Sequence, residues 1–268
     1  RREMIWRMAC EPPLFFAPGQ PEQASIFHEP EYVERQLRSL LPAELPRIPG
    51  MEIATSYETS RRAGGDYYDF FPLPDGKWGI LIADVSGHGT PAAVLMAITH
   101  TIVHSYPGPP TPPERMLQFV NEKLTSRYTS TSDSFVTALY AVYDPERRHL
   151  SYASAGHNPP RLQRSREETV MALDECAGLP LGVSPSAEYE RAELTLESGD
   201  RLVFYTDGVV ETANPEGELF GVRRLDDAIA SKNGSPVDLI GGLRTAVENF
   251  SHGMPAADDQ TVIAAYVD

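Results

Sequence analysis

Short β-type runs separated by pairs of helices are the feature that most constrains the fold of this chain. The β-type runs come in two batches and cover Met51–Tyr57, Asp66–Pro72, Trp78–Val85, Phe135–Tyr143, Leu150–Ala155, Arg161–Gln163, Thr169–Leu173, Tyr189–Leu196, Arg201–Thr206 and Thr261–Val267. Helices are expected at Gly89–Ser105, Gly221–Ser231 and Pro236–Phe250. A further helix, ending at about Tyr128, is expected to begin at a capping-box pattern in Thr111–Glu114. This order predicts an α+β fold in which two sheets pack face to face with helices outside.

Three segments are expected along the chain. Residues 1–30 carry scattered Pro and aromatic residues without a period, which is typical of a lead-in or the tail of an upstream domain. Residues 31–42 form a linker helix with an apolar stripe, and residues 43–268 form one domain. Because the chain starts with Arg1 rather than Met, we expect it to be a fragment of a longer protein. The linker helix is a candidate homodimer seam or signalling element, but it could equally pack on its own domain.

The charge balance excludes several classes of partner. The formal net charge is −15, which disfavours nucleic acids and anionic membrane surfaces. The two cysteines lie far apart, so neither a thiolate metal site nor a disulfide framework is expected. No apolar run approaches the roughly 18 residues of a membrane span. We therefore expect no membrane contact from this chain and a cytoplasmic location.

Acidic residues stand beside turn-forming residues at the ends of four β-type runs. The four clusters are Gly64-Gly65-Asp66-Tyr67-Tyr68-Asp69, Asp84-Val85-Ser86-Gly87-His88-Gly89, Tyr205-Thr206-Asp207-Gly208 and Asp258-Asp259-Gln260-Thr261. A single Asp-Gly pair after a strand is more often a plain turn. Four such clusters favour a site at the rim of the sheets, although spacing alone does not prove that they converge.

Carboxylates that share a pocket repel one another unless a cation lies between them. Oxygen-only ligands favour hard cations, here two divalent ions of Mn²⁺ or Mg²⁺. Two such ions about 3.5–4 Å apart can bind a phosphate and activate a water for in-line attack. The sequence offers no Ser-His-Asp set or cysteine nucleophile, so direct attack by water is the favoured chemistry.

Together, the motifs resemble the SpoIIE/RsbU family of bacterial PPM-type phosphatases. The resemblance rests on the four acidic clusters, with Ala92-Ala93, and on two further motifs, Ala155-Gly156-His157-Asn158-Pro159-Pro160 and Leu179-Pro180-Leu181-Gly182. They occur in the family's order over about residues 37–268. The resemblance implies an α/β/β/α sandwich of two antiparallel sheets with metals in a cleft at one end.

The resemblance also implies roles for individual residues. Asp84 should bridge both metals, the carbonyl of Val85 should complete one coordination sphere, and Asp207 should hold a metal from the opposite sheet. The catalytic set is then Asp84, Asp66 and Asp207. The metal ligands implied are Asp84, Val85, Asp207 and Asp258, with Asp66 near the metals and Asp259 as the alternative to Asp258.

Two residues are candidates for substrate binding. His88 stands where some family members carry Lys, and it is either a proton donor near the leaving group or a turn residue beside the metals. Arg62, or its neighbour Arg61, is a candidate for contacting the substrate phosphate, although a solvated loop arginine is the plainer interpretation. The segment before Gly64 lacks the family's usual proline and valine pattern, which weakens the assignment of either arginine.

Three other polar residues in the motifs have supporting roles. The turn context of His157 favours a structural role. Thr206 and Asn158 are candidates for holding neighbouring site groups in place.

The resemblance implies hydrolysis of phosphoserine or phosphothreonine on a protein. Family substrates are often small STAS-domain anti-sigma-factor antagonists in bacterial stress or sigma-factor signalling, and an upstream sensor domain often drives the enzyme. Two alternatives stay open: a catalytically silent PPM-like binding module, and a nucleotide cyclase because of the Gly64-Gly65-Asp66 turn. The later Asp motifs have no counterpart in such cyclases.

Overall fold

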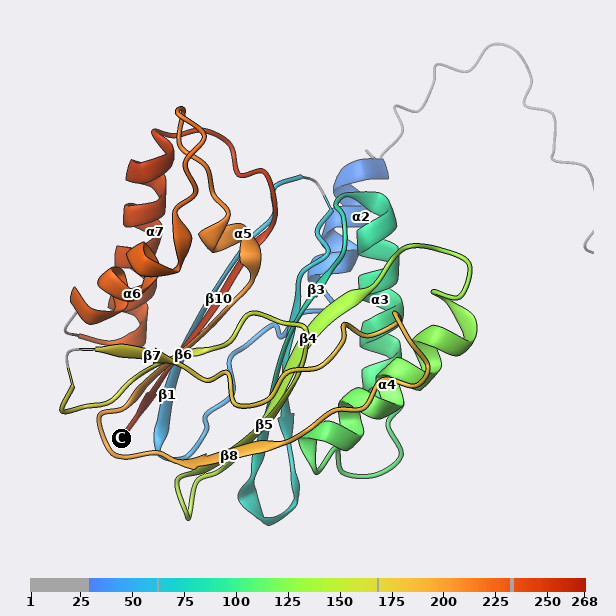
Figure 1. The fold of residues 1–268 in the computed structure, drawn as a ribbon, viewed down its shortest axis with the longest axis horizontal. Coiled ribbons are helices and arrows are strands. Elements are labelled where there is room, and N and C mark those ends of the chain that lie inside the picture. Colours follow the sequence, from blue (N-terminus) through green and yellow to red (C-terminus); the bar gives the residue numbers. More distant parts are fainter. Residues whose placement is uncertain (1–28, 62, 168, 232–233) are drawn as a thin grey trace, which may run out of the picture.

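Two five-stranded sheets form the centre of the structure (Figure 1). The computed structural model describes residues 29–268 except 62, 168 and 232–233. One sheet has the strand order β1-β10-β9-β6-β7 and the other the order β2-β3-β4-β5-β8, and all neighbouring strands are antiparallel. The strands are β1 (Met51–Glu58), β2 (Tyr67–Pro72), β3 (Trp78–Val85), β4 (Val136–Asp144), β5 (His149–Ala155), β6 (Arg161–Gln163), β7 (Val170–Ala172), β8 (Ala192–Thr195), β9 (Arg201–Tyr205) and β10 (Gln260–Val267).

Helices cover the outer face of each sheet, which completes the predicted α/β/β/α sandwich (Figure 1). The helices are α2 (Glu29–Arg38), α3 (Thr90–His104), α4 (Pro113–Arg127), α5 (Asp207–Val210), α6 (Gly221–Ser231) and α7 (Pro236–Ser251), with a short 3-10 turn, η1 (Pro74–Gly76). Helices α3 and α4 pack on β3, β4 and β5, whereas α7 packs on β1 and β10. Within the part of the chain described here, no helix is both long and apolar enough to cross a membrane.

The alternation of side chains along β9 shows how one strand serves two cores. Leu202 and Phe204 belong to the main core, which fills the space between the sheets and under α3 and α4. Val203 and Tyr205 point the other way, into a second core under α6 and α7. Successive residues of a strand face opposite sides of its sheet, so a continuous apolar run fits a strand buried on both faces.

The linker segment contacts the domain instead of standing clear of it. Helix α2 ends at Arg38, earlier than the predicted boundary at 42, and the chain then turns. Leu41 is buried in the main core, and Leu37 and Leu40 pack against it. The Arg38 guanidinium lies 5.7 Å from the centre of the Tyr57 ring. These contacts support packing on the domain, and the homodimer seam stays a prediction.

The expected capping box at Thr111–Glu114 is wrong. The N-cap of α4 is Pro112, and it makes no side-chain cap hydrogen bond. The helix begins with Pro113, which is suited to a first helical position because its missing N–H would have no intrahelical partner there. A capping box does occur at the start of α7, where Ser235 and Asp238 bond reciprocally.

Candidate active site

The four acidic clusters meet at one end of the two sheets. Asp84 is the penultimate residue of β3, and the pairing of Tyr67 with Ala83 in the neighbouring strands brings Asp66 to the same end. From the other sheet, Asp207 follows β9 at the start of α5, and Asp258 precedes β10. Figure 1 shows α5 and the connection from β3 to α3 at this same end. These carboxylates are far apart in the sequence. Strand pairing brings two of them to the end of each sheet, and the packing of the two sheets brings the two pairs together.

Asp66, Asp84, Asp207 and Asp258 are called the acidic cluster below, and Asp84 is its electrostatic centre. Burial raises its pKa, and so do the charges of Asp66, Asp207 and Asp258, to about 9 from an ordinary value of 3.8. A carboxyl group with such a pKa is protonated at neutral pH unless a positive charge compensates. These three neighbours come from both sheets, which indicates that the predicted residues lie close enough at this end for their charges to interact.

Asp66 is fully enclosed at the base of the site. Its Oδ2 accepts hydrogen bonds from the hydroxyls of Thr261 and Thr206, at 2.5 Å and 2.7 Å. Its Oδ1 is buried and has no hydrogen-bond partner among the described residues. Burial raises the pKa of Asp66 to about 7, although the two hydroxyls lower it, and the charges of Asp259 and Asp207 raise it further.

Asp207 and Asp258 lie nearer to solvent. Burial raises the pKa of Asp207, and the charges of Glu211 and Asp258 add to this effect. Burial likewise raises the pKa of Asp258, whereas a hydrogen bond from the Asp259 N–H and the charge of His88 lower it. His88 is exposed, and it lies close enough to Asp258 for its charge to act on that carboxylate.

Both carboxylate oxygens of Asp259 accept hydrogen bonds from the backbone. Its Oδ1 accepts from the N–H of Ser60 at 2.8 Å and from the Ser60 hydroxyl at 3.3 Å, and its Oδ2 accepts from the N–H of Gly65 at 2.7 Å. A Cβ at Gly64 would lie 2.7 Å from this Oδ2. The glycine pair therefore allows the close approach by which Asp259 holds the segment before Asp66.

The backbone of Val85 lies against the same glycine pair. A Cβ at Gly65 would lie 3.1 Å from the Val85 carbonyl oxygen. The side chain of Val85 is buried in the main core, which fixes the turn that follows β3. The predicted substrate contact Arg62 lies outside the described residues, and its neighbour Arg61 is exposed.

Two site residues were not singled out from the sequence. The hydroxyl of Thr261 supports Asp66 as Thr206 does, and Gln260 donates from Nε2 to the Thr212 hydroxyl at 2.8 Å and to the Gly208 carbonyl at 3.3 Å. Both belong to the Asp258-Asp259-Gln260-Thr261 motif, which was the available signal. Gly208 has no room for a side chain, because a Cβ there would collide with the carbonyl oxygen of Asp259.

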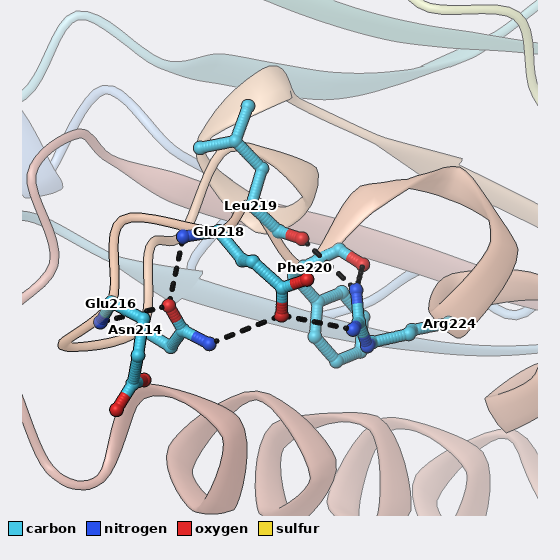
Figure 2. Close-up of polar contacts among 6 residues, drawn as sticks. All are labelled: Asn214, Glu216, Glu218, Leu219, Phe220 and Arg224. Atoms are coloured by element: carbon cyan, nitrogen blue, oxygen red, sulfur yellow. Dashed lines mark hydrogen bonds and ion pairs between the residues drawn. The ribbon is translucent and has the colours of Figure 1, made fainter.

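The loop after α5, residues 211–220, is held by its own polar network (Figure 2). The Asn214 side chain accepts from the N–H groups of Glu216 and Glu218 at 3.1 Å and 2.8 Å, which closes a turn. Arg224 at the start of α6 donates from Nη1 to the carbonyls of Leu219 and Phe220, at 3.1 Å and 3.0 Å. This network fixes the loop beside Asp207.

His157 has a structural role, as its turn context predicted. It is buried, and its Nδ1 lies 2.9 Å from the Thr137 hydroxyl on β4. Burial lowers the pKa of His157 to about 4, so the ring is neutral at physiological pH. A neutral ring tied to β4 stabilises the turn that follows β5 and does not supply a charge to the site.

A family model described as Stage II sporulation protein E (SpoIIE) matches residues 74–268, which is most of the chain. The chain belongs to the SpoIIE family. This membership confirms the resemblance seen in the motifs, and it removes the nucleotide-cyclase alternative. The model's range begins before β3 and therefore includes the clusters of Asp84, Asp207 and Asp258.

Individual proteins agree with this membership. The SpoIIE-family chain is 31% identical to "Phosphoserine phosphatase RsbU" of Bacillus subtilis over 197 residues, which is 74% of this chain and 58% of RsbU. It is 27% identical to "Protein IcfG" of Synechocystis over 258 residues, covering 87% of this chain and 40% of IcfG. The chain thus spans about half the length of these curated relatives.

A solved structure agrees with the fold. The SiaA-PP2C domain of Pseudomonas aeruginosa superposes with a TM-score of 0.75 at 22% identity, over 89% of this chain and 96% of that one. At this identity the similarity concerns the fold alone. It confirms the predicted PPM-type sandwich for this SpoIIE-family chain.

Proposed function

We propose that this chain is a metal-dependent protein phosphatase that hydrolyses phosphoserine or phosphothreonine. The observation that carries the proposal is the convergence of Asp66, Asp207 and Asp258 on Asp84, whose pKa is raised to about 9 by burial first and by these three charges in addition. Such an arrangement of carboxylates is costly in the metal-free protein. It becomes favourable when divalent cations bind between the ionised groups.

The residues present fit a pair of hard cations. The donors are carboxylate and carbonyl oxygens, which suit Mn²⁺ or Mg²⁺. The buried Oδ1 of Asp66 without a hydrogen-bond partner among the described residues is a further free acceptor that faces the cluster. Asp84 would bridge the two ions, with Asp207, Asp258 and the Val85 carbonyl as the other ligands. Bound there, the ions would orient the phosphate and lower the pKa of the attacking water.

The other site residues would hold this arrangement in place. Thr206 and Thr261 fix one oxygen of Asp66, and its other oxygen would be available to the cations or to a water bound to them. Because both oxygens of Asp259 are occupied by backbone and hydroxyl donors, we assign the ligand role to Asp258 and a positioning role to Asp259. His88, whose charge acts on Asp258, would be the candidate to donate a proton to the departing serine or threonine oxygen.

The relatives and the family resemblance support a proposal for the substrate, the signalling pathway and the upstream domain. RsbU is named a phosphoserine phosphatase, and the motifs resemble enzymes that act on STAS-domain anti-sigma-factor antagonists. We therefore propose a STAS-domain phosphoprotein as substrate, a role in bacterial sigma-factor signalling, and an upstream sensor in the full-length protein. The α2 segment would then connect that sensor to the site, because it packs on the main core beside Tyr57.

Phosphate release provides the direct test. We expect turnover of a phosphoserine peptide and of p-nitrophenyl phosphate with Mn²⁺ or Mg²⁺, and none after EDTA treatment. Restoration of turnover when the metal is added back would exclude unfolding by the chelator. Metal binding without turnover on either compound would favour a catalytically silent module, and absence of both would overturn the proposal.

Neighbouring aspartates should respond differently to the same substitution. We expect Asp258→Asn to weaken metal binding at least about tenfold while the metal-free fold keeps its stability. Asp259→Asn should instead lower the free energy of unfolding by about 1–3 kcal/mol, because it weakens three hydrogen bonds to a buried carboxylate. Calorimetric metal titration and urea unfolding separate the two effects. The reverse pattern would assign Asp259 as the ligand.

A further inference from the structure

Three side chains outside the acidic cluster converge on the face of β2 that lies against α3. They are Asp69 of β2 and His100 and His104 of α3, and one ligand atom from each lies within 4.8 Å of the others. We propose that these residues form a second metal site, selective for a borderline divalent transition metal such as Zn²⁺. This site is distinct from the proposed Mn²⁺ or Mg²⁺ centre and does not depend on the proposed phosphatase activity.

The helix places the two histidines as a pair of ligands. Residues four apart lie on the same helix face, and the centres of the two rings are 4.3 Å apart. Both rings face β2. The ring centre of His100 lies 5.5 Å from that of Tyr67, and the ring centre of His104 lies 5.4 Å from that of Phe71. Histidines with this helical spacing are a common half of a zinc site, which a third ligand then completes.

Asp69 is fixed in the position that a third ligand requires. Its Oδ2 accepts from the Tyr67 hydroxyl at 2.6 Å, and its Oδ1 accepts from the N–H of Phe70 at 2.7 Å. The Nε2 of His104 lies 2.8 Å from the same Oδ2. A cation would take the place of the proton that these two groups share, while Tyr67 would continue to orient the carboxylate.

The chemistry of the donors determines the class of metal. Two imidazole nitrogens and one carboxylate oxygen favour Zn²⁺, Co²⁺ or Ni²⁺ over Mg²⁺, whereas the acidic cluster offers oxygen alone. Zn²⁺ bonds of about 2.0–2.2 Å place tetrahedral ligand atoms roughly 3.4 Å apart, so His104 Nε2 and Asp69 Oδ2 would move apart from 2.8 Å, while the ligand atom of His100, within 4.8 Å of both, would move closer. His104 is half-exposed, which lets water occupy the fourth position.

The site is separated from the acidic cluster by the strand itself. Tyr67, Asp69 and Phe71 face α3, whereas Asp66 faces the threonine hydroxyls at the end of the other sheet. His104 ends α3, roughly 20 Å along the helix from its first residue Thr90 at a rise of 1.5 Å per residue. A bound ion would link β2, which directly follows Asp66, to α3, which follows the turn after Asp84.

Zinc titration tests this site directly. The background is the EDTA-treated Asp84→Ala chain in excess Mg²⁺, so that the acidic cluster competes poorly for Zn²⁺. We expect calorimetry to show one Zn²⁺ bound, with affinity lowered more than about 100-fold by His100→Ala, His104→Gln or Asp69→Asn. Tyr67→Phe should lower it about tenfold through the lost hydrogen bond to Asp69. The matched control is His149→Ala, which removes a half-exposed histidine beside Glu193 and should leave the affinity unchanged.

Thermal unfolding gives an independent measurement. Zn²⁺ should raise the melting temperature of the Asp84→Ala chain and of the His149→Ala control, but not that of His104→Gln. Glutamine at 104 can still donate to Asp69, so the metal-free proteins should melt at similar temperatures. If Zn²⁺ does not bind, or if it binds and stabilises His100→Ala and His104→Gln as well as the control, the proposal is wrong.

Discussion

Asp84→Ala should abolish phosphate release while the protein stays folded. Asp84 is the carboxylate on which Asp66, Asp207 and Asp258 converge, so in the proposed mechanism both cations depend on it. Losing several kcal/mol of stabilisation of the transition state corresponds to a rate loss on the order of 10³ or more. Turnover of a phosphoserine peptide at saturating Mn²⁺ measures the loss, and circular dichroism checks the fold.

A matched pair of variants distinguishes a catalytic loss from a structural one. Asp84→Asn keeps the size of the side chain and removes its charge, so it should be as inactive as Asp84→Ala. Asp69→Asn changes a buried aspartate on the same pair of strands but on the other face of β2, so it should keep most of the activity. Equal loss in Asp84→Asn and Asp69→Asn, or substantial turnover in Asp84→Asn, would contradict the assignment of Asp84.

The strands were predictable because their signals are local. Trp78–Val85 is apolar, lies between turn residues, and forms β3 with the predicted bounds. The short helix α5 was missed, because Gly208 and the β-branched Val209 and Val210 disfavour a helix. It forms there because the glycine lets the turn pack against the backbone of Asp259. Local propensity could not reveal this contact between segments far apart in the chain.

The residues of the candidate site could be predicted from the sequence, but the contacts that each side chain makes could not. The sequence placed Asp258 and Asp259 side by side and could not choose between them. Their hydrogen bonds differ, since Asp259 accepts from Ser60 and Gly65, and this difference supports the proposed ligand role of Asp258. The histidines of α3 show the same limit, because His100 and His104 gain a partner only when β2 brings Asp69 beneath the helix. The strand order within each sheet also depends on such distant contacts.

The metal-free protein should lose stability as the pH rises from 6.5 to 9. The pKa of Asp66 is raised to about 7 and that of Asp84 to about 9, and those of Asp207 and Asp258 are also raised. The folded state therefore binds more protons than the unfolded state, so its stability falls with pH until these groups have ionised. One pKa unit corresponds to about 1.4 kcal/mol, so a net loss of a few kcal/mol and a fall in melting temperature on the order of 10 °C are expected.

The decisive quantity is the difference between the wild type and Asp84→Asn in EDTA. General repulsion at a net charge of −15 acts in the same direction in both proteins and cancels in that difference. His157 does not interfere, because its pKa of about 4 in the folded state and its ordinary value of 6.5 both lie at or below the window. Asp84→Asn should be the more stable protein at pH 9, by a margin that shrinks toward lower pH. Excess Mg²⁺ should reverse the order, because cations stabilise the ionised wild-type cluster, and identical pH profiles in EDTA would show that the carboxylates do not interact.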